Sequence, residues 1–492
     1  MLHTRPIDTR EAVDANSHGL RRVLGPTQLI SLGIGAIIGT GIFVLTGQAA
    51  AAHAGPAIVI SMVIAGVASA LAGLCYAEFA ASVPRAGSAY TYAYATLGEF
   101  TAWIIGWDLI LEYALGAATV AVGWSGTLNS LLADFGIQFP ARISAAPGTV
   151  VTLAGGSTIT ALFNLPAVLI AAAVTWLLIR GVRESASVNT VMVFVKVAII
   201  LLVISTGVLF IQPENYTPFI PPNTGVFGEF GWSGIFRGAA VIFFAYIGFD
   251  AVSTAAQEAR DPQRDMPRGI LGSLAICTVL YIAVSAVMVG LVPYLELGGP
   301  APMAVAVDYA RTASEGTVWH GLMKAMAGLI KIGVLAGLSS TIVVQMLAQP
   351  RIFMAMSEDG LLPAWAGRIH PRFRTPHLTT ALTGVVVALA AGFTPIGVLG
   401  QMVSIGTLLA FVIVSLGILV LRRAQPDLPR PFRTPWVPVV PIASAVIATL
   451  LMLSLPGQTW ARLAIWMAIG VALYFGYGAR RAATQRGQAT DT

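Results

Sequence analysis

A cluster of glycines in the first strongly apolar stretch is the clearest chemical signal in the sequence. Four glycines lie between positions 33 and 41, and each weakens a helix by up to about 1 kcal/mol relative to alanine. A break after Ile37 would expose the amides of Gly39, Thr40 and Gly41 at the start of a half-helix. Those donors and the helix dipole suit a carboxylate. The alternative is that Gly35 and Gly39 only permit close helix packing.

A second apolar stretch, about 205 residues later, shows the same kind of interruption at Phe243 to Asp250. A break there would free the carbonyls of Phe244, Ala245 and Ile247, and these acceptors suit an ammonium group. Asp250 is either a direct ligand or the N-cap of a resumed half-helix. Opposed anion and cation subsites, one on each broken helix, describe an α-amino acid as the ligand. Paired broken helices are typical of inverted-repeat transporters that bind substrate at mid-membrane.

Ionisable residues in other apolar stretches could carry coupling chemistry. Lys196 lies deep in Val191 to Ile200, where an isolated lysine is costly and needs a partner, unless it reaches the membrane surface. Glu112 and Asp108 are four residues apart and share a helix face. Because burial disfavours the charged form, we expect Glu112 to carry or sense a proton and to face the substrate amino group. A structural hydrogen bond to a neighbouring helix is the alternative, and Asp108 has a weaker claim.

The elements that would position these residues are membrane helices. The chain has 492 residues, of which 56% are apolar and 10% charged, whereas a soluble domain carries about 25% charged residues. Stretches of about 20 apolar residues predict twelve spans, near 27–53, 56–83, 97–130, 161–180, 185–211, 232–257, 268–292, 318–356, 377–394, 396–421, 436–455 and 459–479. Most of the 28 Lys and Arg residues fall in segments that are cytoplasmic if both termini are inside.

This organisation predicts an all-α integral membrane protein. We expect a cytoplasmic segment at 1–26, a first repeat at 27–211, a second repeat at 232–422, two appended helices at 436–479 and a cytoplasmic tail at 480–492. The net charge of +6 fits anionic lipid headgroups rather than nucleic acid, because the basic residues are scattered among short loops. No metal-ligand cluster, nucleotide loop or catalytic triad is recognisable, so we expect no enzyme activity, cofactor or metal.

Several longer motifs resemble the amino acid–polyamine–organocation superfamily and its cationic amino acid transporter branch. The motifs cover most of the chain and are Gly33 to Phe43, Tyr76 to Tyr90, Trp107 to Tyr113, Phe243 to Gln257, Asp261 to Pro267, Gln349 to Phe353 and Ser357 to Pro363. The resemblance implies a leucine-transporter-like five-plus-five inverted repeat and secondary active amino acid transport. It puts carboxylate contacts at Thr40 and Gly41 and amino-group contacts at the three carbonyls of the sixth span, with Ile37 nearby. It also makes the Phe244 ring the gating aromatic.

The resemblance also gives Lys196 a role. Sodium-coupled relatives hold a cation between the first and eighth helices, whereas proton-linked members place a fifth-helix lysine there. We therefore expect Lys196 to replace sodium, with carbonyls of the first helix and Ser339 or Ser340 as partners. On the eighth span, Val334 is expected to line the side-chain pocket, and Lys331 has no assigned role.

Charges at the cytoplasmic helix ends leave two interpretations open. Glu78, Arg85, Asp261 and Arg264 could pair to close an inner gate, or could be solvated surface charges. The sequence thus predicts proton-coupled uptake of cationic or small neutral amino acids across a bacterial inner membrane, with lipids as neighbours and any accessory subunit unknown. A sodium-independent exchanger, a polyamine transporter and an amino acid sensor are the alternatives.

Overall fold

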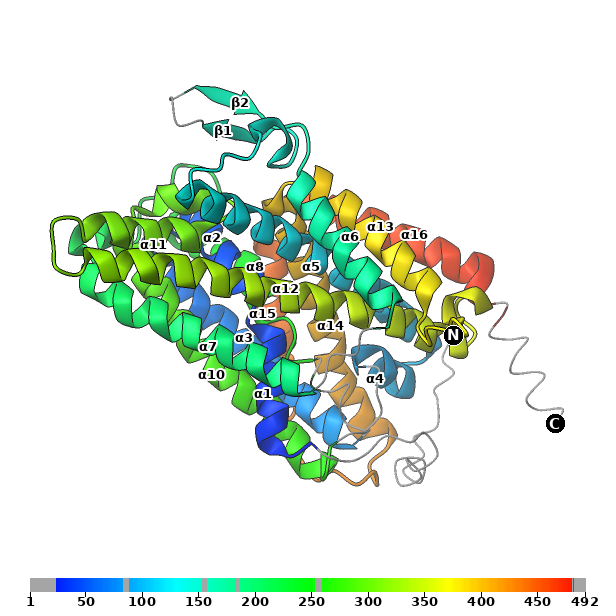
Figure 1. The fold of residues 1–492 in the computed structure, drawn as a ribbon. Coiled ribbons are helices and arrows are strands. Elements are labelled where there is room, and N and C mark those ends of the chain that lie inside the picture. The colour runs from blue at the N-terminus through cyan, green and yellow to red at the C-terminus, as the bar shows by residue number, and fades with distance from the viewer. Residues whose placement is uncertain are drawn as a thin grey trace.

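The computed structural model describes residues 24–82, 88–152, 157–181, 186–250, 252, 259–479 and 481. The protein is a bundle of long apolar helices (Figure 1). Its helices are α1 (Pro26–Ile37), α2 (Thr46–Ala49), α3 (Ile58–Ser82), α4 (Ser88–Thr96), α5 (Glu99–Asp134), α6 (Leu165–Ile179), α7 (Ala186–Gly207), α8 (Gly231–Ile242), α10 (Pro262–Leu291), α11 (Pro302–Ala313), α12 (His320–Glu358), α13 (His377–Phe393), α14 (Ile396–Ala424), α15 (Val439–Ser454) and α16 (Gly457–Leu473).

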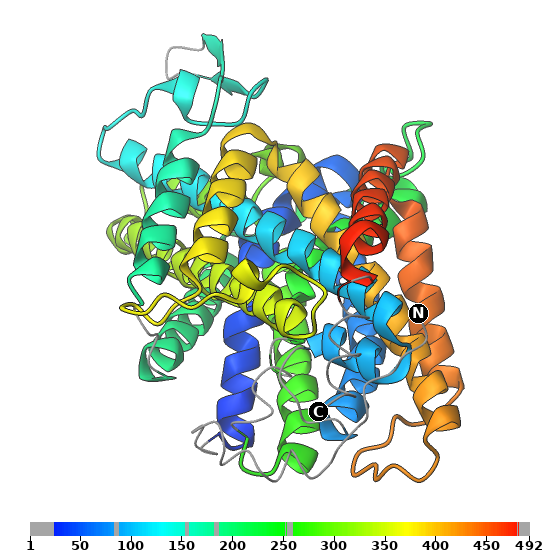
Figure 2. The same cartoon turned by 90° about the vertical axis from the view of Figure 1, so that its right-hand side faces the viewer.

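Short segments of π- and 3-10 helix join or extend these elements. The π-type turns are η2 (Gly41–Leu45), η3 (Ala50–Ala54) and η12 (Tyr474–Gly478), and a 3-10 turn, η8 (Phe243–Tyr246), follows α8. Near one end of the bundle, the strands β1 (Val150–Thr152) and β2 (Thr158–Thr160) form a small antiparallel hairpin that pairs Val150 with Thr160 (Figure 2).

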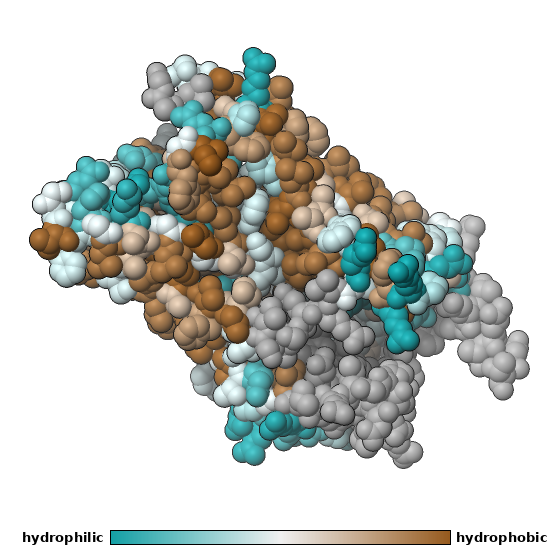
Figure 3. Space-filling model, viewed as in Figure 1, coloured by the Kyte–Doolittle hydropathy of each residue, from teal (hydrophilic) through white to brown (hydrophobic). Residues whose placement is uncertain are grey.

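Seven described helical segments are long and apolar enough to cross a membrane, and four shorter apolar helices accompany them. Large apolar side chains point outward from these helices, among them Phe194, Val279 and Leu389. Hydrophobic residues cover the middle of one face, and hydrophilic ones gather toward its edges (Figure 3). This is the surface of a multi-pass membrane protein, because in water such exposed apolar area would be costly.

The helix ends agree closely with the sequence at some points and not at others. α13 ends at Phe393 and α14 begins at Ile396, on either side of the predicted boundary at Thr394 and Pro395. By contrast, α4 and α11 were not predicted as elements. The expected second half of the sixth span and both terminal segments fall largely outside the described residues.

Candidate functional site

The first helix is broken where the glycine cluster predicts. α1 ends at Ile37, and Ile38 has an extended backbone with φ −70° and ψ 105°. Helical geometry resumes at Thr40, and η2 follows from Gly41. The first N–H groups of a helix have no partner within the helix, so this restart presents backbone donors. The Thr40 hydroxyl beside them is buried and has no hydrogen-bond partner among the described residues.

The carbonyls released by this break are bound by side chains from three other helices. The Lys196 ammonium on α7 donates to Gly35 O at 2.8 Å. The Tyr281 hydroxyl on α10 donates to Ile37 O at 2.9 Å. The Thr341 hydroxyl on α12 lies 3.4 Å from Ile38 O. The carbonyls at the end of α1 therefore have hydrogen-bond donors from neighbouring helices.

Lys196 bridges the first-helix break to α12. Its side chain is fully buried, and Nζ lies 2.9 Å from the Thr341 hydroxyl as well as contacting α1. The expectation that Ser339 or Ser340 would be the partner is therefore wrong. Ser339 instead accepts a hydrogen bond from the Trp124 indole and donates to its own helix. One residue along a helix turns the side chain by about 100°. Thr341, four residues after Gly337, therefore lies nearest in angle to this glycine, which packs on the lysine stem, whereas Ser339 points away.

The sixth helix is interrupted by a tight turn of its own backbone. α8 ends at Ile242, η8 follows, Ile247 is extended, and Gly248 has φ +114°. The Ile247 amide donates to Phe244 O at 3.1 Å, so this carbonyl keeps a backbone partner, contrary to expectation. The Gly248 amide donates to the Asp250 carboxylate at 3.2 Å. Asp250 thus caps the turn.

The two breaks touch each other directly. A Cβ on Gly41 would lie 2.1 Å from the Cα of Ala245. A Cβ on Gly248 would lie 2.6 Å from the carbonyl oxygen of Ala36, and the left-handed φ of Gly248 also excludes side chains. Both glycines are thus required because the two interrupted backbones approach too closely for a methyl group.

A group of buried carboxyls lies beside this junction. Glu112 on α5 is buried and lies within electrostatic range of Asp108, four residues earlier on the same helix, and of Asp250. Neither carboxyl oxygen of Asp108 has a hydrogen-bond partner among the described residues. Gly406 packs against Asp108, where a Cβ would meet the carboxylate at 2.7 Å. Three acidic groups thus share one region of the interior.

The remaining predicted pocket residue, Val334, is buried on α12. It precedes Gly337 by three residues and so lies on a neighbouring part of the same face. Gly337 contacts both the Lys196 stem and the Phe43 ring. Val334 is therefore near the first-helix break. The sequence analysis missed Tyr281 and Thr341, although polar side chains within apolar spans could have drawn attention to them.

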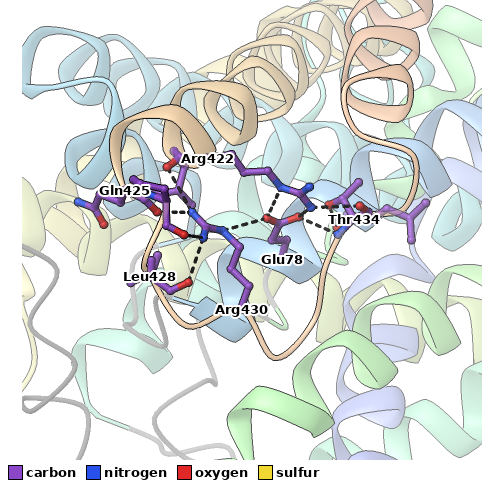
Figure 4. A network of polar contacts seen from close by, with 9 residues as sticks. Glu78, Arg422, Gln425, Leu428, Arg430 and Thr434 are labelled. Atoms are coloured by element: carbon purple, nitrogen blue, oxygen red, sulfur yellow. Dashed lines mark hydrogen bonds and ion pairs between the residues drawn. The ribbon is translucent and has the colours of Figure 1, made fainter.

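Among the described residues, the charges predicted to form an inner gate do not pair with one another. Glu78 is fully buried and forms a bidentate pair with Arg422, at 2.9 and 2.8 Å. Arg430 and the Thr434 amide complete its surroundings (Figure 4). The solvated interpretation is therefore wrong for Glu78, whose partners lie on α14 and the loop after it. Asp261 and Arg264 are exposed, and Arg85 lies outside the described residues.

Comparison with known proteins identifies the family. The family model for amino acid permeases matches residues 24–474. The chain is a member of the amino acid permease family. This confirms the resemblance to the amino acid–polyamine–organocation superfamily that the motifs indicated.

The permease has close relatives among bacterial and plant transporters. It is 46% identical over 477 residues to the methylthioribose transporter of Bacillus subtilis (strain 168), covering 97% of both chains. It is 45% identical over 467 residues to the branched-chain amino acid permease BcaP of the same organism, covering 95% of both. It is 40% identical over 412 residues to the vacuolar cationic amino acid transporter 4 of Arabidopsis thaliana, covering 83% of this chain and 65% of that one.

Proposed function

We propose that this permease takes up α-amino acids across a bacterial inner membrane, driven by the proton gradient. It would cross the membrane twelve times with both termini in the cytoplasm, as five-plus-five inverted repeats at 27–211 and 232–422 followed by two helices. The observation that carries the proposal is the contact of two interrupted helices at Gly41 and Ala245. Amide donors and the Thr40 hydroxyl, which has no hydrogen-bond partner in the described part of the chain, would then lie on one side of the ligand, and carbonyls of the sixth helix on the other.

The proposed ligand positions follow from this junction. The amides of Gly39, Thr40 and Gly41, with the Thr40 hydroxyl, would hold the substrate carboxylate. The Ala245 and Ile247 carbonyls would hold the amino group. Phe244 would cover the substrate, while Ile37 and Val334 would border its side chain. Because no charged group is assigned to that side-chain region, neutral substrates suit it, in line with the name of the BcaP relative.

Proton coupling is supported by two buried groups. The Lys196 ammonium bonds to Gly35 O and Thr341, the kind of partners a bound cation would use, so sodium is not needed. Glu112 lies among other acidic groups, and closely spaced carboxyls cannot all be ionised without a large electrostatic penalty. Glu112 would therefore bind the coupled proton.

Purified protein in liposomes would test this proposal. An inward proton gradient should drive accumulation of a branched-chain or small neutral amino acid without sodium. Glu112→Gln should abolish gradient-driven accumulation but retain exchange of internal for external substrate, whereas Glu214→Gln, at an exposed position, should behave as wild type. Uptake that ignores the gradient and needs internal substrate would instead establish an exchanger.

A second candidate substrate is methylthioribose, because the relative of that name is 46% identical over nearly the whole chain. A thermal-shift screen of amino acids, polyamines and methylthioribose would separate the candidates. Stabilisation by methylthioribose alone, or by polyamines alone, would overturn the assignment of a carboxylate subsite to Gly39, Thr40 and Gly41.

A further inference from the structure

A second buried lysine, Lys331, precedes Val334 by three residues on α12 and has an ion cluster of its own. The Lys331 side chain is fully buried, and Nζ lies 2.6 Å from Asp134 Oδ2 and 2.8 Å from Asp308 Oδ2. Arg311 lies 3.6 Å from each of the same two carboxylates. Two cations thus balance two anions. The cluster joins three elements: the last residue of α5, the middle of α11 and the first half of α12.

The segment held by this cluster also covers the outer half of the first span. Pro302, the first residue of α11, lies against Gly47, where a Cβ would approach to 2.3 Å. Just before it, Gly299 O accepts a hydrogen bond from Gln48 at 3.2 Å, and Pro300 packs on Gly126 of α5. α11 itself packs against η2 and α12 (Figure 1). Residues 299–313 are therefore a cover laid over η2 and α2, which continue directly from Gly41.

The cover depends on Lys331 for a simple electrostatic reason. Asp134 and Asp308 both lie within hydrogen-bonding distance of one ammonium. Without it, these two partly buried carboxylates would share a single cation of the cluster, Arg311, at 3.6 Å from each. Repulsion between them would favour separation of α11 from α5. The lysine in turn is fully buried and would lose its contact with Asp308 if α11 moved away, which would leave Asp134 as its remaining anion in the cluster. Removing one partner from such a buried ion pair is strongly destabilising, because it leaves an uncompensated charge in the interior.

We infer that Lys331 is a positioning residue for transport: it latches α11 over the outer half of the first span and keeps the substrate path closed at this end. This inference rests on the proposed transport function. A solute entering from this end must pass the α11 cover to reach the break at Gly41. Opening requires the Asp308 contact, on α11, to separate from Lys331 on α12, while Asp134 can stay with the lysine.

Thiol labelling from the α11 side tests the latch without any substrate. The reporter is Ala306→Cys, a fully buried position on α11, in a background where the buried Cys75 and Cys277 are replaced by alanine. A membrane-impermeant methanethiosulfonate is the probe. Lys331→Met should raise the labelling rate about tenfold or more, because its loss removes most of the cost of opening. Lys324→Met is the matched control, because Lys324 is exposed on the same helix, and it should label like wild type.

Two further variants keep the result decisive. Asp308→Asn, which removes only the α11 anion, should raise labelling roughly threefold or more and serves if Lys331→Met does not fold. Lys331→Met combined with Asp134→Asn and Asp308→Asn leaves no repelling carboxylates. The latch predicts that this triple variant still labels fast, whereas a purely structural need for neutrality predicts a return to the wild-type rate. Wild-type labelling in folded Lys331→Met or Asp308→Asn would overturn the inference. Because labelling needs no substrate, this outcome is separate from failure of amino acid transport.

Discussion

The breaks in the first and sixth helices meet at one junction, but they are held open in different ways. The first is supported from outside, by Lys196, Tyr281 and Thr341 on three other helices. The sixth is closed mainly by its own chain, through the Phe244–Ile247 turn and the Asp250 contact with Gly248, with an outside hydrogen bond from Ser404 of α14 to Val241 O at 3.1 Å. A break supported from outside depends on where its neighbours stand, whereas a self-contained turn moves as a unit. The first break is therefore the one through which movements of α7, α10 and α12 would reach the proposed substrate site.

The largest expected effect comes from removing the main external support. Lys196→Met deletes two hydrogen bonds from a charged donor, each worth about 1.5–3 kcal/mol. Uptake in liposomes should therefore fall at least about a hundredfold. Lys324→Met, an exposed lysine on α12, should leave uptake unchanged. Wild-type uptake by Lys196→Met would mean that the first break needs no outside support.

Separating the two breaks from each other should have the next largest effect. Gly41→Ala would place a methyl group against the Ala245 backbone, and overpacking of this kind costs about 1–3 kcal/mol. We expect substrate affinity, measured by isothermal calorimetry, to drop about ten- to a hundredfold. Gly397→Ala is the control, because nothing lies within 4 Å of a Cβ at that glycine. Equal affinity in the two variants would contradict direct contact of the breaks during binding.

We expect a smaller effect on substrate binding from removing one hydrogen bond at the first break, and none from removing a similar bond elsewhere in the interior. Tyr281→Phe removes the donor to Ile37 O, which is worth about 0.5–1.5 kcal/mol. Tyr216→Phe removes a similar bond to Ala286 O, away from the site. Both should lower the melting temperature, but only Tyr281→Phe should also weaken substrate binding, by about three- to tenfold. If Tyr281→Phe binds substrate like wild type, the Tyr281 hydroxyl contributes to stability but not to substrate binding.

The smallest effect concerns the unpartnered hydroxyl at the first break, which has a counterpart far away on α13. Thr40 and Thr383 both carry a buried hydroxyl without a hydrogen-bond partner in the described part of the chain. Valine at either position should stabilise the substrate-free protein slightly, by up to about 1 kcal/mol, because an unsatisfied polar group is removed. Only Thr40→Val should weaken substrate binding. If both valine variants bind substrate like wild type, the Thr40 hydroxyl does not contact the ligand.

Local features of this permease could be predicted from its sequence, but the contacts between residues distant in the sequence could not. The break after Ile37 followed from the glycine cluster, because backbone propensity acts within a few residues. The burial of Lys196 followed from its apolar surroundings. Its partner Thr341 lies 145 positions away, and the choice between it and Ser340 depends on a rotation of α12 that no local pattern records. The same limit explains why Glu78 was not matched with Arg422, and why the α11 cover was not foreseen in a stretch too short to span a membrane.

The sequence by itself determined that this protein lies in a membrane and where its helices are interrupted. Its apolar composition requires a bilayer, and its glycine cluster weakens the helix that contains it, whatever the surrounding fold. Only the tertiary structure decided what meets at those places: Gly41 against Ala245, Lys196 against Gly35 and Thr341, and Lys331 between two aspartates. The physical reason is the different distance along the chain over which these effects act. Backbone preferences act over a few residues, whereas the burial of a charge is decided by whichever distant helix brings its counterpart within about 3 Å.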